Sequence, residues 1–127
     1  MRKLLLLGTL ATVLASCNTA TAPYSAVGTW DIRFTQDQSN STFPGVMTIT
    51  AQTQTGELTG VYENSDGSFK NAVSGNVDTG VLRIEDALST HPVDITGKFN
   101  GTTYAGTYRS LIISDAYDTG KVEMTRR

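Results

Sequence analysis

Hydrophobic and polar residues alternate along most of the chain after residue 26. In residues 27–34, Trp30, Ile32 and Phe34 fall on one face and the residues between them are polar. This two-residue period is typical of a β-strand with one buried face. Trp30 is the only tryptophan in the chain, so we expect the core to form around it.

Seven further stretches repeat this alternation, and turn-forming Gly, Asn, Asp and Ser residues separate them. The eight predicted strands are 27–34, 43–53, 57–64, 68–77, 81–85, 93–100, 103–110 and 120–126. Residues 111–119 are predicted to form a longer loop. Short connections without a crossover helix make sequence neighbours antiparallel neighbours in space.

An open sheet of this size would expose two edges and one apolar face, so closure into a barrel is favoured. The predicted fold class is therefore all-β, an eight-stranded antiparallel up-and-down barrel. Inward-facing glycines at positions 60, 75, 97 and 106 fit the sharply bent strands of a small barrel. The bulky inward residues lead us to expect a mostly filled interior with a shallow cavity at one mouth.

The N-terminus has the features of a secretory signal peptide. Arg2 and Lys3 precede an apolar run of about 11 residues, shorter than the ~20 that a membrane-spanning helix needs. We predict three regions: a lipoprotein signal peptide (1–16), a lipidated flexible tether (17–26) and the barrel domain (27–127). An uncleaved membrane anchor is the alternative.

The sequence Leu14-Ala15-Ser16-Cys17 resembles the bacterial lipobox. The resemblance implies that Cys17 becomes the first mature residue and carries the acyl chains that hold the protein at a membrane. The alternative is a chance cysteine in an ordinary signal peptide. Asn18 resembles an outer-membrane sorting signal. We expect export and lipid anchoring at the cell envelope: at the outer membrane if the organism has one, otherwise on the outer face of the plasma membrane.

Charge argues against nucleic acid as a partner. The chain carries 10 basic and 12 acidic residues. Removal of the signal peptide leaves eight scattered basic residues and a net charge of −4. A mildly acidic surface repels phosphate backbones.

No catalytic or metal-binding constellation stands out, so we predict that the protein is not an enzyme and needs no cofactor. His91 is the only histidine, and the only cysteine, Cys17, is expected to carry the lipid. The chain therefore cannot supply the usual zinc ligand sets. The segments 64–67 and 115–118 are weak candidates for calcium. Were there an enzymatic activity, Glu85, Asp115 and Asp118 would be the first acids to test.

Several large side chains are candidates for the rim of a ligand or partner site. Residues 111–113 are three consecutive aliphatics that cannot all face one core, so they either pack as a lid or stay exposed. The predicted rim residues are Tyr62, Tyr104, Tyr108, Leu111, Ile112, Ile113 and Tyr117.

Three short segments give the barrel a resemblance to calycins of the avidin type: 28–30 (Gly-Thr-Trp), 58–62 (Leu-Thr-Gly-Val-Tyr) and 74–77 (Ser-Gly-Asn-Val). Lipocalins share the Gly-x-Trp opening and pack an arginine of the last strand across that tryptophan. The resemblance implies that Arg126 lies against Trp30 and closes the barrel. Avidins line their biotin pocket with several tryptophans of later strands, which this chain lacks.

Together these features predict a membrane-anchored, extracytoplasmic lipoprotein that acts as a non-catalytic binding or structural module. Its partners would be the membrane, through the lipid on Cys17, and a small apolar ligand or an envelope protein. The alternative is an inhibitor of a secreted hydrolase, a peptidase or lysozyme, that inserts a loop or terminus into its target.

Overall fold

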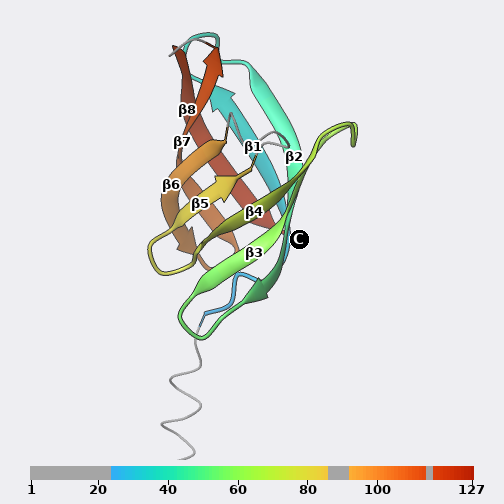
Figure 1. Ribbon diagram of the computed structural model, residues 1–127, viewed down its shortest axis with the longest axis vertical. Helices are drawn as coiled ribbons and strands as arrows, with labels where there is room; N and C mark the ends of the chain where they lie inside the picture. The colour runs from blue at the N-terminus through green and yellow to red at the C-terminus, as the bar shows by residue number, and fades with distance from the viewer. Residues whose placement is uncertain (1–23, 86–91, 114–115) are drawn as a thin grey trace, which may run out of the picture.

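A computed structural model describes residues 24–85, 92–113 and 116–127. They form a closed barrel of eight antiparallel strands that follow one another in sequence order (Figure 1). The strands are β1 (Gly28–Gln36), β2 (Thr42–Gln52), β3 (Glu57–Asn64), β4 (Lys70–Asn76), β5 (Val81–Ile84), β6 (Val93–Asn100), β7 (Thr103–Ile113) and β8 (Ala116–Arg126). The predicted all-β, eight-stranded barrel is confirmed.

Pairing of the first and last strands closes the barrel. In the β1–β8 register Trp30 lies opposite Arg126, and Phe34 lies opposite Val122. Strands β6 and β7 approach each other so closely that the contact requires glycine. Gly97 of β6 faces Gly106 of β7, and a Cβ on Gly97 would lie 2.7 Å from the Gly106 Cα. The glycine pair therefore allows two strongly bent strands to run close together.

The up-and-down order gives the barrel two different ends. The connections β1–β2, β3–β4, β5–β6 and β7–β8 lie at one end, which we call the open end. The connections β2–β3, β4–β5 and β6–β7 lie at the other, which we call the closed end. The chain enters β1 and leaves β8 at the closed end, so both termini of the barrel lie there.

The last hairpin differs from the sequence prediction. Residues 111–119 were expected to be a loop, but β7 continues to Ile113 and β8 starts at Ala116. Backbone pairing extends along this hairpin from Ser110↔Asp118 to Leu111↔Tyr117. The alternating pattern misses this extension because Leu111-Ile112-Ile113 breaks the two-residue period, and the register shifts between Leu111 and Ile113.

Residues 24–26, which belong to the tether predicted from the sequence, pack on the closed end. Ala26 is fully buried, and its carbonyl accepts a hydrogen bond of 2.9 Å from the Trp30 indole. Its amide donates to the Gln52 side chain, which in turn donates to the Tyr24 carbonyl. Residues 17–23 of the predicted tether lie outside the described residues.

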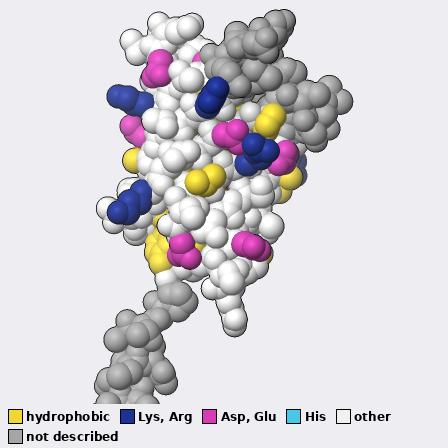
Figure 2. All heavy atoms as spheres, turned by 60° about the vertical axis from the view of Figure 1, so that its left-hand side comes forward, with side chains coloured by type: hydrophobic (Ala, Val, Ile, Leu, Met, Phe, Trp, Pro, Cys, Tyr) yellow, Lys and Arg dark blue, Asp and Glu magenta, His cyan; other side chains and the backbone are white. Residues whose placement is uncertain are grey.

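The face of the barrel seen in Figure 2 is mainly polar. Figure 2 shows acidic and basic side chains interspersed over one face of the barrel, with hydrophobic side chains in small separate groups. The described part of the chain contains no helix that is long and apolar enough to cross a membrane.

Candidate functional site

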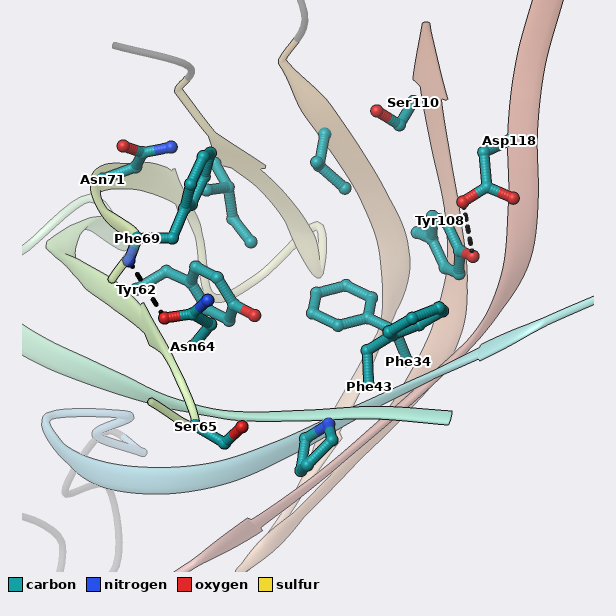
Figure 3. Close-up of a pocket in the computed structure, with 13 residues that line it drawn as sticks. Phe34, Phe43, Tyr62, Asn64, Ser65, Phe69, Asn71, Tyr108, Ser110 and Asp118 are labelled. Carbon is teal, nitrogen blue, oxygen red and sulfur yellow. Dashed lines mark hydrogen bonds between the residues drawn. The ribbon is translucent and has the colours of Figure 1, made fainter. Parts of the chain in front are cut away.

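The open end of the barrel holds a cavity of about 620 Å³. All eight strands and the β3–β4 connection contribute to its wall (Figure 3). The lining residues are Phe34, Phe43, Pro44, Tyr62, Asn64, Ser65, Phe69, Asn71, Ile84, Val93, Tyr108, Ser110 and Asp118. Cavities of a few hundred Å³ with mainly apolar walls are typical of small-molecule sites.

Three aromatic rings form the floor of this cavity. Phe34 contacts Tyr62 edge-to-face, with ring centroids 5.8 Å apart, and Tyr108 in the same manner at 5.2 Å. All three side chains are buried, whereas Phe43 and Phe69 at the rim are each 47% exposed. The cavity therefore runs from a fixed aromatic floor to an exposed aromatic rim.

Asp118 is the one charged group among the described lining residues. Its carboxylate accepts a hydrogen bond of 3.0 Å from the Tyr108 hydroxyl (Figure 3). It accepts another, of 2.9 Å, from the Gln36 side-chain amide. Burial, followed by the hydrogen bond to Asp118 and its negative charge, raises the pKa of Tyr108 well above that of a free tyrosine. Tyr108 is thus a protonated donor at neutral pH.

The β3–β4 side of the cavity carries polar groups of two kinds. The Asn64 side chain is engaged, because it accepts from the Phe69 amide at 3.0 Å and donates to the Ser68 hydroxyl. Tyr62 and Asn71 lie opposite each other in the strand register and are 8% and 7% exposed. Neither the Tyr62 hydroxyl nor the Asn71 side-chain amide has a hydrogen-bond partner among the described residues. Burial raises the pKa of Tyr62, so this hydroxyl also stays protonated.

The closed end is filled instead of hollow. The Arg126 guanidinium carbon lies 4.6 Å from the centroid of the Trp30 ring, as the resemblance to calycins implies. Arg126 also donates to the Tyr24 hydroxyl and to the Ser25 carbonyl. Phe99 packs edge-on against Trp30, with centroids 5.5 Å apart. These contacts leave the core closed where the chain enters and leaves the barrel.

The structure brings together only part of the predicted rim. Tyr62 and Tyr108 line the cavity. Tyr104 does not: it is 1% exposed, packs on Phe99 and donates a 2.6 Å hydrogen bond to the Gly80 carbonyl at the closed end. It differs from the expectation because residues four apart on one strand face point the same way but lie near opposite ends. The side chains of Leu111, Ile112, Ile113 and Tyr117 lie outside the described residues.

Sequence reasoning missed several lining residues. Asn71 could have been identified from the sequence, because a polar residue at an inward position of a strand indicates a polar site inside the barrel. Asp118 is predicted as an acid to test and as part of a calcium candidate, but not as a rim residue, because it falls within the predicted loop; the extended β7–β8 pairing places it beside the cavity. Phe43 near the start of β2 and Phe69 in the β3–β4 connection line the cavity but stay half-exposed, which their alternation in sequence does not reveal.

Turn chemistry accounts for one of the two calcium candidates. In segment 64–67, Asp66 accepts from the Ser68 amide, and the Gly67 amide bonds the Asn64 carbonyl. The hydrogen bonds of Ser68 lower the pKa of Asp66. Across the residues that the structure describes, no three His, Cys, Asp or Glu side chains are grouped as a metal site. Asp86, His91 and Asp115 lie outside those residues.

No family model and no curated protein matches the chain in sequence. Among solved structures, the chain is similar to that of a bradavidin2–biotin complex, with a TM-score of 0.60 and 13% sequence identity. The alignment covers 82% of this chain and 99% of the bradavidin2 chain. At this identity the similarity establishes an avidin-like barrel fold.

Proposed function

We propose that the protein is a non-catalytic binding protein that takes a small, largely apolar ligand at the open end of its barrel. The observation that carries this proposal is the cavity of about 620 Å³, with its aromatic floor and few polar groups. The similar bradavidin2 structure was solved with biotin, which supports the capacity of this barrel type to hold a small molecule.

Biotin itself is not the expected ligand. The resemblance to avidins implies a pocket walled by several tryptophans, but Trp30 is the only one here and lies buried at the closed end. The floor is built of Phe34, Tyr62 and Tyr108 instead. Rings of this kind favour a flat, apolar ligand body through edge and face contacts.

Native mass spectrometry tests this proposal. Residues 18–127, exported without the lipid, are weighed in the folded state and again after denaturation. A mass excess that disappears on unfolding supports a bound ligand and identifies it. A bare mass that stays bare after incubation with envelope extract and with small aromatic compounds contradicts the proposal.

The location at a membrane is part of the same proposal. Cys17 would carry the lipid, and seven residues, 17–23, connect it to the packed segment that starts at Tyr24. Fully extended, seven residues span at most about 25 Å. The closed end would then lie near the membrane, and the open end would point away from it.

Two experiments test this arrangement. Cys17→Ser is expected to release the protein from the membrane fraction, and retention there would contradict lipid anchoring. For the orientation, a fluorophore is placed on Thr55→Cys at the β2–β3 turn or on Ser39→Cys at the β1–β2 turn of the lipidated protein. Bilayer quenchers should reach the Thr55 site more strongly, and stronger quenching at the Ser39 site would reverse the orientation.

A further inference from the structure

Asn71 is the only residue in the described part of the chain that is polar and buried, and it lines the cavity. It sits on β4 beside buried Val73, with exposed Lys70 and Ala72 on the outer face. None of the described residues forms a hydrogen bond with its side-chain amide. An amide in such a position costs stability unless something in the cavity bonds it.

The other strongly polar lining groups are already engaged. Asn64 holds the β3–β4 turn, and both Asp118 oxygens accept hydrogen bonds from neighbouring side chains. The Tyr62 hydroxyl has no hydrogen-bond partner among the described residues, but a single hydroxyl both donates and accepts and therefore discriminates little between polar ligands. Asn71 presents two donors and one acceptor in a fixed plane, which makes it the more selective group.

Charge narrows the class of ligand. No lysine or arginine belongs to the described lining, and Asp118 contributes a negative charge. A carboxylate or phosphate in the cavity would be repelled and left without a counter-ion. An ammonium group would lose its hydration in mostly apolar surroundings, next to a carboxylate that already accepts two hydrogen bonds.

We propose that Asn71 determines ligand specificity and selects an uncharged ligand with an apolar ring body and a carboxamide-type group, such as an amide or lactam. The donor and acceptor of that group pair with the acceptor and donor of the Asn71 amide. This inference rests on the proposed function and names the ligand class of the same cavity.

Three probes that share one ring test the inference: 2-naphthamide, 2-naphthoate and 2-naphthylmethylammonium. Calorimetric titration of residues 18–127 is expected to give the tightest binding for the amide. Asn71→Leu, which keeps an apolar side chain of similar size, should weaken amide binding about ten-fold and change naphthoate binding little. Ser74→Leu, on the outer face of the same strand, serves as the matched control and should leave all three affinities unchanged.

A second variant separates specificity from folding. Asn71→Asp retains the shape of the side chain but removes its donors and adds a negative charge, so the preferred probe should change from the amide to the ammonium compound. Thermal unfolding should show that Asn71→Leu is about as stable as the wild type, since it replaces a cavity-lining amide that has no hydrogen-bond partner among the described residues with an apolar side chain of similar size.

The outcomes distinguish this inference from the proposal on which it rests. Equal binding of all three probes, or an amide preference that survives in Asn71→Leu, overturns the role of Asn71 and leaves the binding cavity intact. Absence of binding for every probe to the wild-type protein overturns both.

Discussion

The two ends of this barrel are built from similar residues but differ in what surrounds those residues: the closed end is packed, and the open end borders a cavity. At the closed end, aromatic rings pack on one another, Arg126 covers Trp30, and the Tyr104 hydroxyl and Trp30 indole both donate to backbone carbonyls. At the open end, Phe34, Tyr62 and Tyr108 border a cavity, and the Tyr62 hydroxyl and Asn71 amide have no partner among the described residues.

This difference indicates that stability and binding are separated along the barrel axis. A small barrel needs one well-packed core to fold, and the closed end provides it around the only tryptophan. The open end can then leave apolar surface unburied and polar groups unpaired, at a cost that a ligand offsets. Substitutions at the two ends should therefore have different consequences.

Trp30→Ala should have the largest effect on stability. The indole is fully buried, so its loss leaves a void at the closed end and should lower the free energy of unfolding by about 3–5 kcal/mol. Phe34→Ala at the open end should cost less, because its ring already borders the cavity. Urea unfolding measures both, and an equal or larger loss for Phe34→Ala would contradict the division of roles.

Arg126→Met should have the next largest effect. It removes the cation over Trp30 and the hydrogen bonds to Tyr24 and Ser25, which should lower stability by about 2–3 kcal/mol. The matched control is Arg127→Met, which removes an exposed ion pair with Asp31 and should have no measurable effect. Urea unfolding measures the free energy of unfolding of both variants, and equal values would refute the role of Arg126.

The fold could be predicted further than the site, for reasons visible in particular residues. Alternation and turn residues follow from local sequence, and the resemblance to calycins implies the Trp30–Arg126 contact; together they predict the barrel. The cavity depends on which inward side chains leave space, and that depends on strand register and axial position. Tyr104 and Tyr108 share a face in sequence, yet one fills the closed end and the other lines the cavity. Asp118 reaches the site only through the strand extension that the aliphatic run 111–113 obscured.

Alkaline pH should weaken both ends. Burial raises the pKa of Tyr104 and Tyr108 above the unfolded value of 10.0, so the unfolded chain loses these protons first as pH rises. Stability is then fully present below pH 10 and falls above it, by up to about 1.4 kcal/mol per pH unit for each tyrosine. Tyr104→Phe and Tyr108→Phe should each flatten this decline in urea unfolding between pH 9 and 11. A pH-independent stability in that range would contradict the prediction.

Rim substitutions should have the smallest effect on stability and a clear effect on binding. Phe43→Ser and Phe69→Ser replace half-exposed rings, so each should change the free energy of unfolding by less than about 1 kcal/mol. Both remove apolar surface from the cavity mouth and should weaken 2-naphthamide binding several-fold. Val81→Ser, a similarly exposed site outside the cavity lining, is the control and should leave binding unchanged.

The most direct test of the central claim is chemical-shift mapping of residues 18–127 titrated with 2-naphthamide. The indole N–H of Trp30 reports on the closed end, and the Asn71 side-chain amide reports on the open end. Binding at the cavity predicts large shifts for Asn71 and for the rings of Phe34, Tyr62 and Tyr108, with the indole signal unmoved. A moving indole signal beside unchanged cavity residues, or no shift at either end, would contradict the account.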